Sequence, residues 1–283
     1  MIPCVARRPE AAGRRQVAAP RRAAPPCYTG RVPPTDPHSA VPRHPPVELT
    51  LESDGLRLAA RLFLPGEEPP LGALLVCHGA GSRKEKHVVM AEQAAHSGLA
   101  AMVFDFPGHG ASEGAMDAHA DHAVRAAARA LLTESAAPWV AGRGSSMGAY
   151  WLLRAAAADP GLFRSLVVLC PADEEALLRG LEHFEELSES DDPDVAFCGR
   201  FDRDSLRALW LSSRLTDTAR GLPRVLVAHA RDDDDVPFAV SERLAAVVAP
   251  PTRFIALPHG GHKAPQRSAS VARATLDWVF QQA

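Results

Sequence analysis

The feature that most constrains the fold is an alternation of short apolar runs and longer amphipathic stretches from residue 47 almost to the C-terminus. Apolar runs of about four to eight residues predict strands that are covered on both faces. The predicted strands are 73–77, 99–106, 139–142, 165–170, 224–230 and 253–257, and the predicted helices are 86–98, 117–134, 147–158, 238–249 and 268–282. Because strands and helices in alternation form βαβ units, we expect an α/β fold with a mainly parallel central sheet and helices on both faces.

A hairpin is predicted before the first of these units. The runs 47–52 and 56–64 have strand character and flank Asp54-Gly55. An Asp-Gly pair between two strands is a strong signal for a tight turn, so the two runs are expected to pair as antiparallel neighbours.

One interval, about 173–222, contains no predicted strand and is strongly acidic over 173–194. Leu177, Leu181 and Phe184 recur there at helical spacing, which predicts an amphipathic helix. We interpret this insert as a small helical cap on the domain, with a plain two-helix connection as the alternative.

The first 46 residues differ from the rest in composition. They hold eight Arg, two acidic residues and 11 of the 25 prolines. Such a segment cannot bury enough apolar area to offset its ordering entropy, so we expect a disordered extension at 1–46 and a single domain at 47–283. A targeting extension is an alternative interpretation of the arginines.

Composition excludes several classes of protein. A net charge of -3 and a pI near 6.5 provide no basic field for nucleic acid or an anionic membrane. No apolar run is long enough for a membrane-spanning helix, and no secretory signal is recognisable. The five cysteines are scattered, which favours reduced thiols in a cytoplasmic protein over a disulfide framework or a zinc site. The oligomeric state is left open.

The stretch "GRGSSMGAY" (142–150) lies between a predicted strand and a predicted helix. A dinucleotide-binding G-x-G-x-x-G pattern fails because Met147 occupies the third glycine position. Read as G-x-S-x-G, the match is complete with Gly144, Ser146 and Gly148. Glycines on both sides let a strand and a helix approach closely around a strained serine. Ser146 is therefore the candidate nucleophile, and Ser145 a bystander.

A serine hydroxyl needs a base to activate it and an acid to orient that base. Downstream, "HARDDDDVP" (229–237) and "PHGGHKAP" (258–265) each follow a predicted strand. Loops at the carboxyl ends of parallel strands meet at one edge of the sheet, where such folds place their sites. The order Ser, Asp, His along the chain therefore suggests a catalytic triad.

Together with "CHGAGS" (77–82) and "FDFPGHGASEG" (104–114), these motifs resemble the α/β-hydrolase fold superfamily over about residues 47–283. The chain is most similar to small serine esterases and serine aminopeptidase-like hydrolases. The resemblance implies the α/β-hydrolase fold and a serine hydrolase that needs neither a metal nor an organic cofactor.

Residue by residue, the resemblance selects Asp233 as the acid, with Asp232 or Asp234 as alternatives if the turn differs. The remaining carboxylates of the Asp run are expected to form a solvated turn. It selects His262 rather than His259 as the base. This assignment completes a predicted Ser–Asp–His triad.

An oxyanion hole needs two fixed N–H donors. The residue after the nucleophile, Met147, should supply one at the start of a helix, and the resemblance assigns Ala80 as the other. The resemblance also assigns structural roles to three residues that could be mistaken for catalytic groups, His78, His109 and Asp105.

The predicted function is cleavage of a small-molecule carboxylic ester, or an amide, through an acyl-enzyme, with a carboxylesterase favoured over a peptidase. Acyl transfer and cofactor-free perhydrolysis use the same triad and are alternatives. A non-catalytic ligand-binding protein on this scaffold is a third hypothesis, because the fold alone does not determine function.

Overall fold

The computed structural model describes residues 45–66, 68–187 and 200–282 of the 283-residue chain. The predicted N-terminal extension, apart from its last two residues, lies outside the described residues, and so does 188–199 of the insert. The domain boundaries therefore stay predictions.

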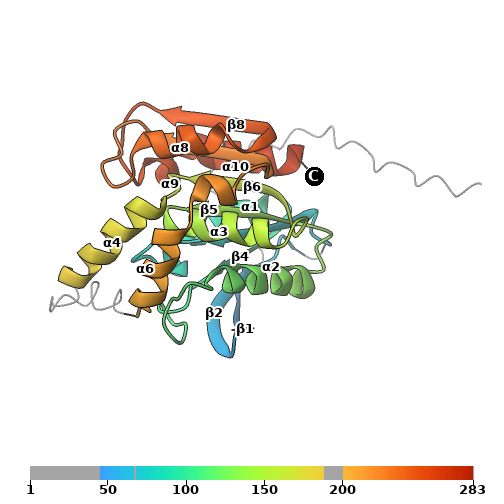
Figure 1. Ribbon diagram of the computed structural model, residues 1–283. Helices are drawn as coiled ribbons and strands as arrows, with labels where there is room; N and C mark the ends of the chain where they lie inside the picture. Colours follow the sequence, from blue (N-terminus) through green and yellow to red (C-terminus); the bar gives the residue numbers. More distant parts are fainter. Residues whose placement is uncertain (1–44, 67, 188–199, 283) are drawn as a thin grey trace, which may run out of the picture. The chain divides into compact units, whose positions relative to one another are not determined.

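One sheet organises the described residues (Figure 1). Its eight strands are β1 Val47–Ser53, β2 Leu56–Phe63, β3 Gly72–Cys77, β4 Leu99–Phe104, β5 Val140–Ser145, β6 Phe163–Leu169, β7 Pro223–Ala230 and β8 Ala249–Leu257. Their order is β1-β2-β4-β3-β5-β6-β7-β8, with β2 antiparallel to its two neighbours and every other pair parallel. The predicted mainly parallel sheet is confirmed. Asp54 and Gly55, both at positive φ, form the predicted turn between β1 and β2.

Helices cover both faces of the sheet, as predicted (Figure 1). The helices outside the insert are α1 Val88–His96, α2 Asp121–Ser135, α3 Met147–Ala158, α8 Phe238–Ala245, α9 Ala264–Arg267 and α10 Ala269–Gln281. Side chains of α1 and α10 share one hydrophobic cluster with the strands, and those of α2, α3 and α8 share the other. None of the helices in the described part of the chain combines the length and the apolarity needed to cross a bilayer.

The insert contains three described helices, α4 Glu174–Leu187, α6 Arg203–Ser212 and α7 Leu215–Thr218. Leu177 and Leu181 of α4 are buried in the same cluster as Leu206 and Trp210 of α6, and the two helices lie side by side (Figure 1). The predicted amphipathic helix is confirmed, although the side chain of Phe184 lies outside the described residues.

The strand predicted at 139–142 is longer than expected. β5 continues through Gly144 and Ser145, because Gly144 pairs with Cys77 of β3 and Ser145 pairs with Leu169 of β6. Glycine and serine have low strand propensity, but pairing on both sides outweighs it. As a result, the serine loop begins only at Ser146.

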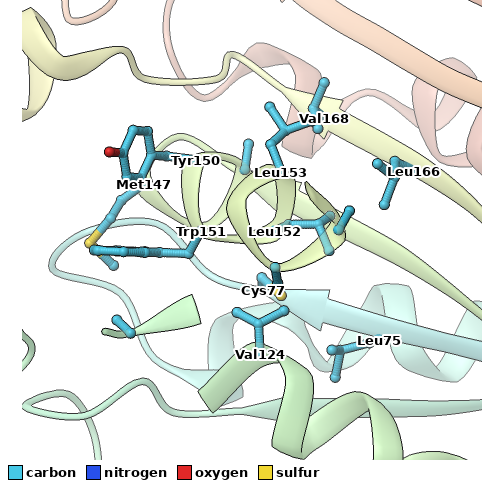
Figure 2. Packing of buried hydrophobic residues seen from close by; sticks show 14 of the residues in the cluster. Leu75, Cys77, Val124, Met147, Tyr150, Trp151, Leu152, Leu153, Leu166 and Val168 are labelled. Atoms are coloured by element: carbon cyan, nitrogen blue, oxygen red, sulfur yellow. The ribbon is translucent and has the colours of Figure 1, made fainter. Parts of the chain in front are cut away.

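The helix that follows is held rigidly in the core. Figure 2 shows Met147, Tyr150, Trp151 and Leu152 on the first two turns of α3, and each of these side chains is buried. Close packing around a helix start limits its movement, so the residue before it is presented on a fixed support.

Candidate active site

Ser146 occupies the sharp turn between β5 and α3. Its backbone adopts φ 53° and ψ −121°, a conformation that L-residues rarely occupy and that costs about 1–3 kcal/mol. The surrounding chain holds it there: the Ser146 N–H donates to the carbonyl of Leu169 at 2.9 Å, and its own carbonyl accepts from the Ala172 N–H at 3.3 Å. Strain of this kind is typical of functional sites.

The two glycines of the motif are required by close backbone approach. A Cβ on Gly144 would lie 2.6 Å from the carbonyl oxygen of Gly148. A Cβ on Gly148 would lie 2.3 Å from the carbonyl oxygen of His78 and 2.5 Å from that of Cys77. The sequence interpretation of these glycines as sites of close approach between strand and helix is therefore confirmed.

Asp233 and His262 meet at the carboxyl edge of the sheet. Asp233 lies in the turn after β7, and its Oδ2 accepts a hydrogen bond from His262 Nδ1 at 2.8 Å. The other oxygen, Oδ1, accepts from the backbone N–H groups of Val236 at 2.9 Å and Asp235 at 3.0 Å. The carboxylate is buried and oriented by these bonds.

The electrostatics of this pair favour the charged carboxylate. Burial alone would raise the pKa of Asp233, but hydrogen bonds from His229 and His262 outweigh it and hold that pKa well below its usual range. Burial alone would lower the pKa of His262, whereas its hydrogen bond to Asp233 raises that pKa above its ordinary value. Asp233 therefore makes the His262 ring a stronger base.

Asp232 has a role that sequence reasoning missed. Its carboxylate accepts from the backbone N–H groups of Gly260 and Gly261, both at 2.9 Å, and so ties the turn after β7 to the loop that carries His262. Asp232 is exposed, as expected of a solvated turn, but it also makes these two specific hydrogen bonds. No local pattern links two segments 28 residues apart, although an Asp run and a Gly-Gly pair at neighbouring strand ends were the available signal.

Ser146 contacts the last residue of β6, and His262 contacts the residue after it. The Ser146 N–H bonds to Leu169 as above, and Cys170 Sγ donates to the carbonyl of His262 at 3.2 Å. Among the described residues, no hydrogen bond joins the Ser146 hydroxyl to the His262 ring. Such bonds are often long without substrate and tighten only in the complex.

The two expected oxyanion donors belong to segments that adjoin the serine. Met147 is the first residue of α3, so its N–H has no carbonyl partner one turn earlier in the helix. Ala80 follows Gly79, and a Cβ built on Gly79 would lie 3.3 Å from Ser146 Cβ. The loop after β3 therefore lies against the serine turn.

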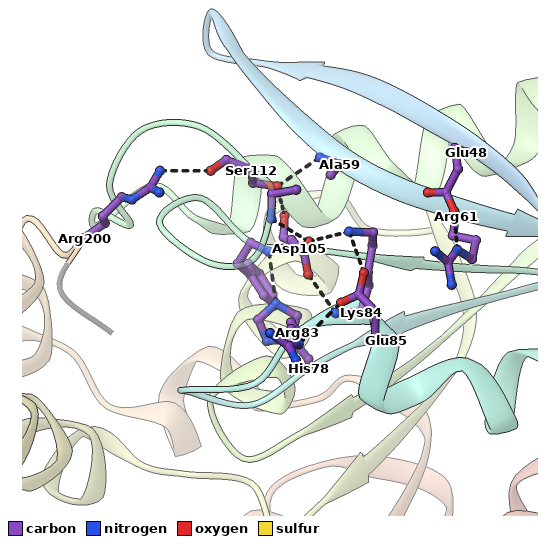
Figure 3. A network of polar contacts seen from close by, with 12 residues as sticks. Glu48, Ala59, Arg61, His78, Arg83, Lys84, Glu85, Asp105, Ser112 and Arg200 are labelled. Carbon is purple, nitrogen blue, oxygen red and sulfur yellow. Dashed lines mark hydrogen bonds and ion pairs between the residues drawn. The ribbon is translucent and has the colours of Figure 1, made fainter. Parts of the chain in front are cut away.

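His78 and Asp105 join the loops after β3 and β4 (Figure 3). His78 donates from Nδ1 to the carbonyl of Gly79 at 2.8 Å and accepts at Nε2 from the Phe106 N–H at 3.1 Å. Asp105 accepts from the Lys84 backbone N–H at 2.7 Å and from Lys84 Nζ at 2.8 Å. These contacts agree with the structural roles expected for both residues. His109 is also buried and bonds at Nδ1 to the carbonyl of Pro107, 3.1 Å away.

One group of metal-ligating side chains occurs in the described part of the chain: Cys170, Asp233 and His262 offer ligand atoms within 4.8 Å of one another. The hydrogen bond between Asp233 and His262 already accounts for the positions of two of the three side chains. We therefore interpret the group as an acid–base pair beside a thiol and assign no metal to it.

Comparisons with known proteins bear on the fold and on the first part of the site. A family model described as serine aminopeptidase S33 matches residues 68–187, which include Ser146 but end before Asp233 and His262. Two uncharacterized proteins of Mycobacterium tuberculosis are each 26% identical over 233 residues, which cover 75% of this chain and 70% of theirs. Together with the solved structures described next, the family match supports the α/β-hydrolase fold.

Two solved structures show the same fold. Est1E from Butyrivibrio proteoclasticus with bound ferulic acid superposes with a TM-score of 0.68 at 21% identity, covering 83% of this chain and 98% of that one. A serine hydrolase without lid from Xanthomonas campestris gives a TM-score of 0.58 at 20% identity, covering 83% and 93% of the two chains.

Proposed function

We propose that this chain, which has the α/β-hydrolase fold, is a serine hydrolase that cleaves small carboxylic esters through an acyl-enzyme. The observation that carries the proposal is the strained backbone of Ser146 at the carboxyl edge of the sheet where Asp233 binds His262. We also propose a cytoplasmic location, which the free thiols of Cys77 and Cys170 support.

In the proposed reaction, Ser146 Oγ attacks the ester carbonyl while His262 Nε2 accepts the hydroxyl proton. Asp233 holds the ring through Nδ1 and stabilises the imidazolium that forms. His262 then donates the proton to the leaving alkoxide, and the acyl group remains on Ser146. A water molecule, deprotonated by the same nitrogen, attacks the acyl-enzyme and releases the acid.

The negative charge that develops on the carbonyl oxygen is assigned to the N–H groups of Ala80 and Met147. Loss of one such donor costs about 3 kcal/mol of transition-state stabilisation in comparable enzymes. Esters are favoured over amides because their leaving group departs more readily. Since Est1E was solved with ferulic acid, aryl-substituted acyl esters belong in the substrate panel beside short and long alkyl esters and aminoacyl anilides.

The proposal is tested with p-nitrophenyl acetate and butyrate. Ser146→Ala should abolish turnover and labelling by a fluorophosphonate, while the matched control Ser145→Ala should keep both. Retained turnover in Ser146→Ala would refute the assignment of the nucleophile. A wild-type protein that neither turns over nor becomes labelled would instead be a ligand-binding protein on this fold, and product analysis with competing alcohols would reveal acyl transfer.

A further inference from the structure

A second histidine contacts the same carboxylate oxygen as His262. His229 lies near the end of β7 and is completely buried. Its Nε2 lies 2.9 Å from Asp233 Oδ2, the oxygen that also accepts from His262 Nδ1 at 2.8 Å. On the other side of the ring, His229 Nδ1 lies 2.7 Å from Ser241 Oγ, which is also completely buried. Four side chains therefore form one row from α8 to the candidate base.

The surroundings of the His229 ring determine its tautomer. Both atoms near Nε2, the Asp233 carboxylate oxygen and the Val236 carbonyl oxygen at 3.1 Å, can only accept a hydrogen bond, so Nε2 carries a proton. In this tautomer Nδ1 accepts from the Ser241 hydroxyl. In this arrangement every polar atom of the buried ring has a partner, which is the condition for burying it at low cost.

We propose that His229 is a positioning residue that shares Asp233 Oδ2 with the catalytic His262, and that Ser241 fixes the tautomer in which it does so. The inference rests on the proposed function only in calling His262 catalytic. Because Oδ1 is held by two backbone N–H groups, the carboxylate keeps its orientation when Oδ2 loses one donor. The role of His229 is therefore to set how much of the negative charge on Oδ2 acts on His262.

Because His229 and His262 share Asp233 Oδ2, the direction in which loss of His229 shifts the pKa of His262 can be derived. A donor that bonds Oδ2 reduces the charge available to stabilise protonated His262, so removal of His229 should raise the pKa of His262. Other titratable or charged groups near the row are unchanged in the variant. The Cys170 thiol lies beside His262, and the Asp232 carboxylate accepts from the backbone of the loop that carries His262. The Arg231 guanidinium lies 4.7 Å from the centre of the Phe238 ring, which packs against His229.

The experiment follows the titration of His262 by NMR of imidazole-labelled protein in the Ser146→Ala background, which needs no turnover. His229→Leu should raise the titration midpoint of His262 by about 0.5–1 pH unit. His229→Gln can keep a donor near Oδ2, so its midpoint should lie close to the wild-type value. Ser241→Ala should raise the midpoint less than His229→Leu does. His119→Leu is the matched control, because His119 is exposed and its ring packs against that of His122.

Kinetics in the active protein provide a second measurement. At neutral pH, His229→Leu should lower kcat several-fold with KM unchanged, because more of the base is protonated, and a higher pH should restore the rate. An unchanged or lowered His262 midpoint in both His229→Leu and Ser241→Ala would overturn the proposal. If the midpoint rises although the wild-type protein hydrolyses no ester, the positioning role stands and the proposed function fails.

Discussion

Two clusters of histidine and aspartate lie at the carboxyl edge of the same sheet, and they use the same residue types differently. Beside β3 and β4, both ring nitrogens of His78 are bonded to the backbone, and Asp105 binds Lys84. Beside β7 and β8, Asp233 binds His262 only through Nδ1, and that ring keeps part of its surface exposed. The two clusters therefore do not differ in residue type. They differ in that His262 keeps Nε2 for a substrate, whereas both ring nitrogens of His78 are bonded to the backbone.

This difference predicts that the cluster beside β7 and β8 controls the rate of catalysis. Asp233→Asn keeps the shape of the side chain but removes the charge that orients His262, and in comparable triads this change lowers kcat about 10⁴-fold. The measurement is kcat on p-nitrophenyl butyrate, with circular dichroism to check the fold. Because Asp233 is also bonded to His229, Asp234→Asn is the control for the turn and should leave kcat within about twofold. A loss below tenfold in Asp233→Asn would contradict the assignment.

The first cluster should control stability instead. Lys84 is buried and pairs with buried Asp105, so Asp105→Asn leaves an ammonium with Glu85 as its remaining carboxylate partner, 2.9 Å away. Removing one partner of a buried pair costs about 3–5 kcal/mol of unfolding free energy, and the contact with Glu85 favours the lower end. Urea unfolding measures this loss. The exposed pair of Arg220 and Asp217 provides the control, since Asp217→Asn should cost less than about 1 kcal/mol.

Activity completes that test. The folded fraction of Asp105→Asn should keep kcat within a few-fold of the wild type, because neither Asp105 nor Lys84 is bonded to the serine or to His262. The division into a stability cluster and a rate cluster would be wrong if Asp105→Asn lowered kcat as far as Asp233→Asn does and left the unfolding free energy unchanged.

These contacts also show what a sequence can predict. The helix predicted at 147–158 coincides with α3, because a glycine-flanked serine before a long apolar stretch is a local signal. The bond from Asp232 to the loop of His262 and the bond from His229 to Asp233 Oδ2 depend on how the β7 and β8 loops fold together. The extension of β5 to Ser145 depends on its two neighbouring strands. Non-local pairing, rather than residue preference, decides all three.

The last predicted effect concerns pH and again divides the clusters. His78 is buried, which lowers its pKa to about 3, so its unfolded form binds a proton more readily and stability falls as pH drops below about 6.5. For His262 the folded pKa is raised, so its contribution to stability is full below about 6.5 and is lost as pH rises through the folded value.

Activity should follow the opposite course, because only neutral His262 accepts a proton. We expect kcat/KM to rise with pH on a limb centred above 6.5, while the unfolding free energy falls by about 1.4 kcal/mol for each unit by which the folded pKa exceeds the unfolded one. Urea unfolding at several pH values, in wild type and in His262→Gln, measures this loss. The variant should lose less stability on the alkaline side and behave like the wild type on the acidic side. An equal alkaline loss in both proteins would assign that loss to another group and would remove His262 as its source.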